Sequence, residues 1–195
     1  MWSPLIGSIE STSDIRFLPQ RPYFTRQSLR AQITLPDPPD NASDATCYAI
    51  LEKLQITSIL KDTVFRETRK PKRTLLGRLL KGKEESAVES PSNHTNPLDQ
   101  LPQRSWYKTL SPGNQQLLAF CRVLYHNPRV VIMDEATSAV SEECTARIYA
   151  LLAELGACYL SVSHDESLER FHDRVIVIAG DGQGWSYKNI EKEGA

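Results

Sequence analysis

Val130-Val131-Ile132-Met133-Asp134-Glu135 places a short apolar run directly before two carboxylates. Such a run predicts a strand that is buried in a parallel sheet. Helical patterns of apolar residues flank it over 115–126 and 141–155, and further apolar runs follow at 158–162 and 175–179. Strands that alternate with helices in this way predict an α/β fold with a parallel sheet and helices on both faces.

Three residues near the predicted strand ends indicate phosphate chemistry. Asp134 ends the apolar run, where open α/β sheets bind ligands, and its carboxylate can hold Mg²⁺ through a water shell. Glu135 can polarise a water molecule, and His164, after the next apolar run, can contact a terminal phosphate. Hydrolysis of a γ-phosphate needs these functions together. Each residue alone fits an ordinary turn equally well, so the interpretation depends on their order along the chain.

A second phosphate-binding surface is predicted at Leu110-Ser111-Pro112-Gly113-Asn114-Gln115-Gln116. Ser111 offers a hydroxyl, and Gly113 permits close approach of the backbone. Gln115 is predicted to open a helix whose N-terminal amides favour an anion.

The first part of the chain predicts a strand over 15–18 that leads into a loop, because Pro19 and Pro22 exclude a helix there. Gln20 lies in this loop. Further on, Ser43 is predicted to cap a helix with one apolar face, formed by Cys47, Ile50, Leu51 and Leu54.

Composition indicates a globular protein without a strong charge field. The 195 residues are 40% hydrophobic, and 23 Lys and Arg nearly balance 24 Asp and Glu, so nucleic acid is not an expected partner. No apolar stretch approaches the ~18 residues of a membrane span, and we expect the chain as written to be soluble. Four cysteines at irregular spacing predict buried free thiols in a reducing compartment: Cys47, Cys121, Cys144 and Cys158.

Residues 66–104 differ from the rest of the chain. Basic residues crowd its first half, and Ser, Pro, Asn and Gln dominate the second. We expect a solvated, disordered insertion within one domain that spans 1–195.

Taken in order, the motifs resemble those of ABC transporter nucleotide-binding domains. Leu110–Gln115 resembles the signature loop, and Val130–Glu135 resembles the Walker B strand. Pro19-Gln20 resembles the Q-loop, and His164 resembles the switch histidine. The resemblance covers nearly the whole chain apart from about 66–104. It implies a P-loop NTPase-like sheet with a helical subdomain that carries the signature loop.

The resemblance also implies ATP and Mg²⁺ as ligands, with a role for each motif residue. The expected catalytic residues are Glu135, His164 and Gln20. The expected Mg²⁺ ligands are Asp134 and Gln20. The expected contacts to ATP are Ser111, Gly113 and Gln115.

Finer features resemble subfamily D, the half-transporters of peroxisomes and lysosomes. These are Trp106-Tyr107, Ser138–Ser141, and Phe171-His172 followed by Gly184-Trp185. Pro112 is similar to the lysosomal cobalamin branch, whereas Ser138–Ser141 is closer to the peroxisomal acyl-CoA transporters. The cobalamin branch is favoured, and both stay open.

No G-x-x-x-x-G-K-[ST] phosphate loop occurs in the sequence, and Met1–Gly7 is expected to begin just beyond one. The resemblance then implies an incomplete sheet, without the Walker A strand and helix. Apolar surface and strand edges would be exposed, so we expect an aggregation-prone chain.

Three interpretations therefore stay open, of which a soluble α/β domain with fortuitous motifs is disfavoured by the four motifs in order. The first is the C-terminal part of an ATP-hydrolysing domain that powers transport of cobalamin or fatty acyl-CoA. Its expected partners are a second nucleotide-binding domain and a transmembrane domain absent from this sequence, at the cytosolic face of an organelle membrane. The alternative is a non-hydrolysing module that supplies only its signature loop to a full-length partner.

Overall fold

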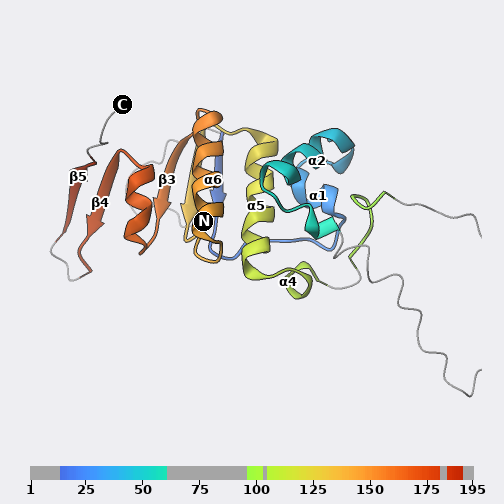
Figure 1. Cartoon of the computed structure of the whole chain (residues 1–195), viewed down its shortest axis with the longest axis horizontal. Coiled ribbons are helices and arrows are strands. Elements are labelled where there is room, and N and C mark those ends of the chain that lie inside the picture. The colour runs from blue at the N-terminus through green and yellow to red at the C-terminus, as the bar shows by residue number, and fades with distance from the viewer. Residues whose placement is uncertain (1–13, 61–95, 103–104, 181–183, 191–195) are drawn as a thin grey trace, which may run out of the picture. The chain divides into compact units, whose positions relative to one another are not determined.

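The protein is described by a computed structural model over residues 14–60, 96–102, 105–180 and 184–190. It forms two compact units. Residues 1–21 and 127–195 make one, here called the sheet unit, and residues 22–126 make the other, called the helical unit. Figure 1 shows the strands together with α6 in the first and the other labelled helices in the second, which agrees with the predicted sheet and helical subdomain.

Three parallel strands form the main sheet of the sheet unit, in the order β1-β2-β3. They are β1 (Ile15–Leu18), β2 (Val130–Asp134) and β3 (Cys158–Val162). The helix α6 (Glu142–Glu154) lies between β2 and β3 in the chain. All four elements match the sequence prediction. Ile15 pairs with Val130, which pairs with Cys158, so the three strands reach the same edge together.

The two faces of this sheet differ in burial. Val131 and Met133 of β2 are buried, on the face where Tyr149 of α6 contacts Tyr159 of β3. The opposite face carries exposed apolar side chains: Phe17 (58%), Leu160 (52%) and Val162 (56%). The exposed apolar surface that the sequence analysis expected is thus present on this face.

The helix α6 is capped at both ends. Ser141 lies just before its first residue, and the Ser141 hydroxyl accepts a hydrogen bond from the Cys144 N–H. At the other end Gly156 has φ +65°, and its N–H donates to the Ala153 carbonyl. The Ala157 N–H donates to the Leu152 carbonyl, which completes a Schellman motif.

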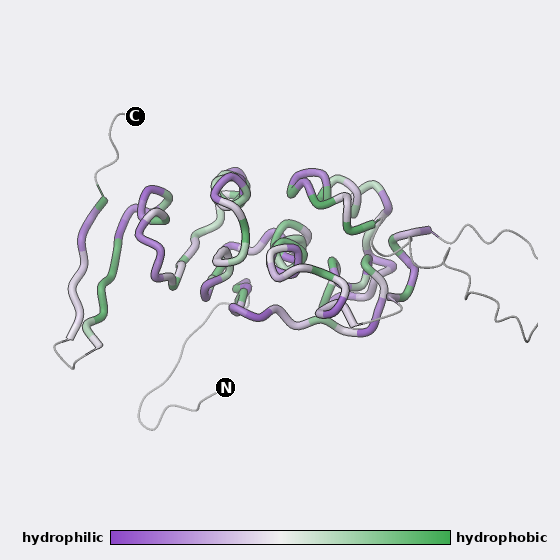
Figure 2. Tube along the Cα trace, turned by 60° about the horizontal axis from the view of Figure 1, so that its bottom comes forward, coloured by the Kyte–Doolittle hydropathy of each residue, from purple (hydrophilic) through white to green (hydrophobic). Residues whose placement is uncertain are grey.

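The last two strands depart from the prediction of a single parallel sheet. The strands β4 (Arg174–Ile178) and β5 (Trp185–Asn189) pair antiparallel in a sheet of their own. A short connection joins them, and short connections suit antiparallel strands, whereas parallel strands need a long crossover. Figure 2 shows β4 as mainly hydrophobic. The 3-10 helix η3 (Glu166–Phe171) precedes this hairpin.

The helical unit contains α1 (Leu29–Thr34), η1 (Pro39–Asn41), α2 (Asp44–Lys53), α4 (Trp106–Thr109) and α5 (Pro112–His126). The helix α5 packs against α1, α2 and α4. Because several elements cover α5, it is buried on more than the predicted face. Leu118 and Val123 are fully buried, and Leu124 is half-buried. The predicted cap at Ser43 and the buried face of α2 are confirmed.

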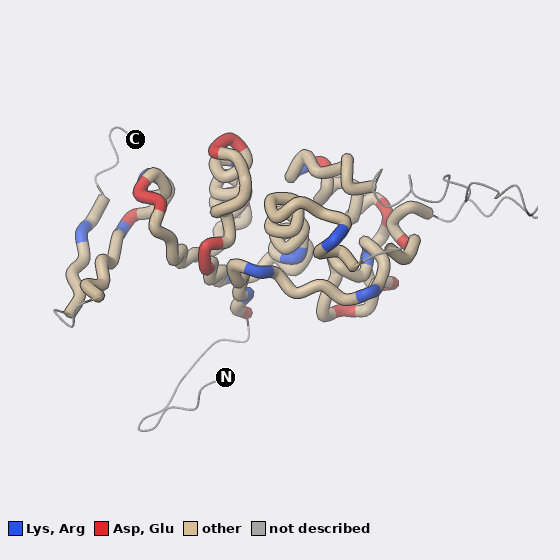
Figure 3. Tube along the Cα trace, turned by 90° about the horizontal axis from the view of Figure 1, so that it is seen from below, with Lys and Arg blue, Asp and Glu red and all other residues tan. Residues whose placement is uncertain are grey.

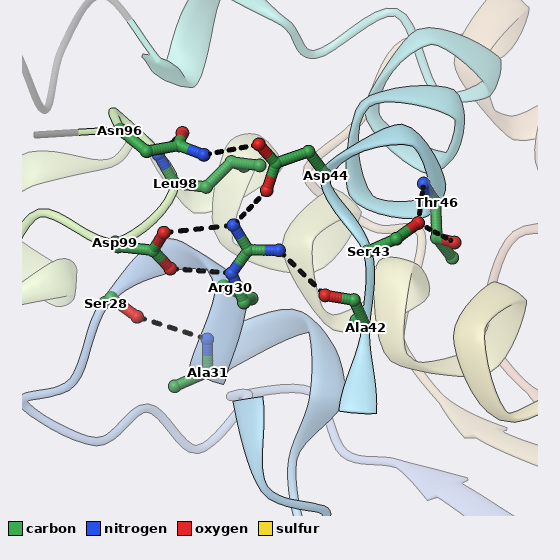
Figure 4. Close-up of polar contacts among 10 residues, drawn as sticks. All are labelled: Ser28, Arg30, Ala31, Ala42, Ser43, Asp44, Thr46, Asn96, Leu98 and Asp99. Atoms are coloured by element: carbon green, nitrogen blue, oxygen red, sulfur yellow. Dashed lines mark hydrogen bonds and ion pairs between the residues drawn. The ribbon is translucent and has the colours of Figure 1, made fainter. Parts of the chain in front are cut away.

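A buried arginine joins distant parts of the helical unit (Figure 4). Arg30 of α1 donates to both oxygens of Asp99, through Nε at 2.6 Å and a second nitrogen at 3.0 Å. It also pairs with Asp44 and donates to the Ala42 carbonyl at 2.8 Å. The guanidinium holds the pKa of Asp99 below its usual value through these hydrogen bonds.

The predicted insertion over 66–104 falls mostly outside the described residues, including its basic cluster. Its last part is described and belongs to the helical unit. Leu98 is fully buried, and its carbonyl accepts the Arg30 N–H at 2.9 Å. Within the predicted insertion, the described residues 96–102 therefore pack as part of the helical unit.

The four cysteines are free thiols. Cys47 and Cys121 are buried, as predicted, and Cys144 is half-buried. Cys158 is exposed because it begins β3 on the uncovered face of the sheet, so the expectation of burial is wrong there. Burial raises the pKa of the Cys121 thiol.

Charged residues of both signs are interspersed along the described chain (Figure 3). Within the part that the structure describes, no helix combines the length and apolar character that crossing a bilayer requires.

Candidate functional site

The carboxyl edge of the main sheet gathers four of the predicted residues. Asp134 ends β2, and Glu135 follows it. Gln20 lies exposed in the bend after β1, and His164 comes after the end of β3. Because the three strands are parallel and in register, all four residues stand at the same edge.

Glu135 and His164 are in direct contact. Glu135 Oε1 accepts a hydrogen bond from the His164 N–H at 3.1 Å and lies 2.7 Å from Nδ1 of the His164 ring. The Glu135 side chain is 17% exposed and that of His164 is 86% exposed. A half-enclosed carboxylate therefore orients an accessible imidazole.

The backbone at Glu135 turns sharply to make this contact. Glu135 has φ +49°, a conformation that is uncommon outside glycine and is found where a site requires it. Its N–H still donates to the Val162 carbonyl at 2.9 Å, which ties it to β3. Its own carbonyl accepts the Ser138 hydroxyl at 2.8 Å. The direction of the Glu135 side chain is thus fixed from both sides.

The contact changes the titration of the histidine. The hydrogen bond and the negative charge of Glu135 raise the pKa of His164 above its ordinary value. The carboxylate holds Nδ1, so Nε2 of this exposed ring is the nitrogen that would contact a phosphate, the role that the sequence predicts for His164.

The residues at this edge fit a Mg²⁺ ion that is bound chiefly by phosphate and water. Among the described residues no group of three or more His, Cys, Asp or Glu side chains could hold a metal by itself. Mg²⁺ commonly takes only one or two protein oxygens and completes its shell with phosphate and water. The Asp134 carboxylate and the Gln20 amide oxygen are donors of that kind.

The predicted signature loop begins α5, the longest of the described helices in the helical unit. The helix α5 starts at Pro112, earlier than the predicted start at Gln115. Ser111 caps it, since its hydroxyl accepts the Asn114 N–H at 3.2 Å, and proline is favoured at the first helical position. Gly113 lies in the first turn.

Gln115 braces the loop instead of opening the helix. Its amide Nε2 donates to the Leu110 carbonyl at 3.0 Å and lies 3.4 Å from the Tyr107 carbonyl. The predicted helix start at Gln115 is wrong because Ser111 caps the helix. Serine followed by proline favours a helix start more strongly than Asn114 and Gln115, which lie inside the helix.

Tyr107 holds the segment before the signature loop, a structural role that the sequence analysis, which used it with Trp106 only as a subfamily feature, did not predict. Its hydroxyl accepts the Phe24 N–H at 3.1 Å and donates to the Pro22 carbonyl at 2.9 Å. Trp106 Nε1 donates to the Gln27 carbonyl at 3.0 Å. Two adjacent aromatic residues with polar tips before a helix cap were the available signal. They bind the segment after Gln20 to the segment before the signature loop.

Comparison with known proteins decides the family. The model of the ABC transporter family matches residues 7–138. The chain belongs to the ABC transporter family. For this ABC transporter chain, the resemblance drawn from the four motifs is therefore confirmed.

Relatives of the chain include members of subfamily D. It is 33% identical over 201 residues to the lysosomal cobalamin transporter ABCD4 of Homo sapiens, covering 99% of this chain and 28% of that protein. It is 31% identical over 180 residues to ABC transporter D family member 2 of Dictyostelium discoideum, covering 92% of this chain and 20% of that protein. The subfamily resemblance is thus confirmed, and the chain spans less than a third of these relatives.

A solved structure shares the fold of this ABC transporter chain. A bacterial Atm1-family ABC exporter with ATP bound has a TM-score of 0.57 and 19% sequence identity, covering 85% of this chain and 23% of that one. At this identity the match confirms the fold class alone.

Proposed function

We propose that this chain is the C-terminal part of the ATP-binding and ATP-hydrolysing domain of a subfamily D half-transporter that powers transport across an organelle membrane. The contact between Glu135 and His164 carries the proposal. It supports the proposal because a carboxylate and an imidazole lie side by side at the sheet edge where Asp134 ends β2.

Each residue at this edge has one step to perform. Glu135 accepts a proton from the water that attacks the γ-phosphate, and His164 donates to a terminal phosphate oxygen. Asp134 and Gln20 would hold Mg²⁺, which neutralises charge on the phosphates when it is bound. The bond between the γ-phosphorus and the bridging oxygen breaks, ADP and inorganic phosphate leave, and the proton passes from Glu135 to solvent.

The signature loop serves a different nucleotide. Ser111, Gly113 and Gln115 lie at the capped N-terminus of α5, where backbone amides favour an anion. We assign them to the ATP of a second nucleotide-binding domain, in a homodimer or heterodimer that also carries a transmembrane domain.

The favoured cargo is cobalamin, at the cytosolic face of the lysosome. The 33% identity to a lysosomal cobalamin transporter and the residue Pro112 support this choice. Fatty acyl-CoA at the peroxisome is the second candidate, supported by Ser138–Ser141.

The test measures ATP hydrolysis by an equimolar mixture of a complete subfamily D nucleotide-binding domain and this chain with that domain's Walker A strand, loop and helix fused ahead of residue 1, because residues 1–195 contain no G-x-x-x-x-G-K-[ST] loop. Part of the ATP hydrolysis rate of the mixture depends on this chain. We expect Glu135→Gln to slow that part roughly 100-fold or more. Glu143→Gln is the control, because Glu143 is an exposed carboxylate on α6 paired with Arg147.

The alternative function gives the opposite pattern. If the chain is a non-hydrolysing module, Ser111→Ala slows the mixture and Glu135→Gln leaves it unchanged. A mixture no faster than the complete domain alone, with neither variant having an effect, would contradict both functions.

A further inference from the structure

Three side chains of the sheet unit form a continuous hydrogen-bonded relay. Tyr149 of α6 places its hydroxyl 2.8 Å from the Ser161 Oγ on β3. The same Ser161 oxygen lies 2.9 Å from Nε2 of His172, which follows η3. Nδ1 of His172 lies 2.8 Å from the Leu168 carbonyl.

The direction of the hydrogen bonds follows from their ends. A carbonyl can only accept, so Nδ1 of His172 carries the hydrogen toward Leu168. In a neutral ring Nε2 then accepts, and the Ser161 hydroxyl donates to it. The Ser161 oxygen in turn accepts from Tyr149. Each polar atom of the relay is satisfied without a charge.

Aromatic contacts pack the relay tightly. Tyr149 stacks on Phe171 at 4.5 Å with an interplanar angle of 6°. The His172 ring meets Tyr149 and Tyr159 edge to face, each at 5.3 Å. The Tyr159 hydroxyl also donates to the Phe171 carbonyl. Burial raises the pKa of Tyr149, which keeps its hydroxyl a donor.

The relay joins the two ends of the segment that carries His164. The segment leaves β3 after Val162 and ends at Phe171, so Ser161 and His172 stand at its two ends. His164 itself has an 86% exposed side chain and touches the sheet through Glu135. Its distance from Glu135 therefore depends on how firmly the ends of the segment are held.

We propose that Tyr149, Ser161 and His172 are positioning residues that hold the His164 segment so that its imidazole meets Glu135. The inference rests on the proposed role of His164, but the contact it explains can be measured without hydrolysis. The hydroxyl of Ser161 is the centre of the device, because it alone bonds to both other members.

The experiment compares the full chain with Ser161→Ala, which removes both bonds, and Ser161→Thr, which keeps the hydroxyl on a strand that tolerates β-branching. Amide hydrogen exchange over 163–171 and the NMR titration of the His164 ring are the readouts. We expect Ser161→Ala to speed exchange in that segment roughly fivefold or more. The pKa of His164 should fall toward its ordinary value.

Rescue and a matched control separate positioning from general loosening. Ser161→Thr should restore both readouts, and Ser186→Ala, the same change on exposed β5, should alter neither. Exchange that rises equally in β1 and β2, or a His164 titration that Ser161→Ala leaves unchanged, would overturn the proposal. If the readouts respond while Glu135→Gln leaves hydrolysis unchanged, the relay stands and the proposed hydrolysis fails.

Discussion

The Glu135 carboxylate and the His164 imidazole, 29 residues apart in sequence, meet at 2.7 Å at the edge of the parallel sheet. The contact joins the end of β2 to the end of β3. A carboxylate and an imidazole that touch one another cannot act independently, because moving one changes the charge that the other experiences.

Replacing Glu135 with Gln should lower the pKa of His164. The pair raises that pKa above 6.5, so the stability it contributes is fully present below about pH 6.5. It is lost as the pH rises through the raised value. NMR titration of the His164 ring measures the change, with Glu143→Gln as the control. An identical titration in wild type and Glu135→Gln would contradict the pairing.

Replacing Gly156 with Ala should destabilise the protein by about 1–2 kcal/mol, the cost of the left-handed conformation. Its φ is +65°, and an added Cβ would meet nothing within 4 Å, so the cost comes from the backbone alone. Gly180→Ala is the control, because that site is equally open and has no positive φ. Urea denaturation measures both. Equal effects at the two glycines would contradict the Schellman geometry.

Replacing Asp99 with Asn should cost about 1 kcal/mol at neutral pH, a figure discounted for the 44% exposure of its side chain. The lowered pKa of Asp99 means that its contribution is present above about pH 4. It disappears as the pH falls through the lowered value, so the variant and wild type should converge in acid. Asp40→Asn, at an exposed site in η1, should change stability by less than about 0.5 kcal/mol.

Replacing Tyr107 with Phe should destabilise the helical unit by about 1–2 kcal/mol, because the Phe24 N–H and the Pro22 carbonyl both lose their partner. The ring contact with Phe24 should remain. Tyr23→Phe removes the same hydroxyl from a side chain that is 64% exposed and serves as the control. If both variants denature at the same urea concentration, the bridge through Tyr107 contributes nothing.

The apolar face of the main sheet should bind a hydrophobic dye and promote self-association of the purified chain. Leu160→Gln should reduce both, because Leu160 lies on that face and is 52% exposed. Leu101→Gln changes a leucine that is 69% exposed but lies in the helical unit, and should have a smaller effect. Sharp thermal unfolding without dye binding in the wild type would argue against the prediction.

Helices and strands whose apolar residues follow a clear pattern could be predicted from the sequence. The strand β2 is wholly apolar before Asp134, and α6 shows a clear apolar face between Ser141 and Gly156. The strand ends then place Asp134, Glu135 and His164 correctly, since parallel strands share an edge. The motif residues could be located because their positions depend on these local patterns.

The helix α1 was missed because all six of its residues are buried. A helix covered on every side shows no amphipathic period. Its polar residues find partners far away in sequence, as Arg30 does with Asp99, 69 residues on. Such pairing depends on tertiary structure and leaves no local signal.

The anchor at Arg30 bears on what holds the helical unit together besides the covalent chain. Ile59 and Leu98 are both fully buried, and Arg30 pairs with Asp44 on one side of residues 61–95 and with Asp99 on the other. A cut in the chain between Ile59 and Leu98 would therefore leave two fragments that these ion pairs still hold against one another. Expressing the two fragments separately and recovering them as a complex would turn this anchor into a fragment-complementation assay.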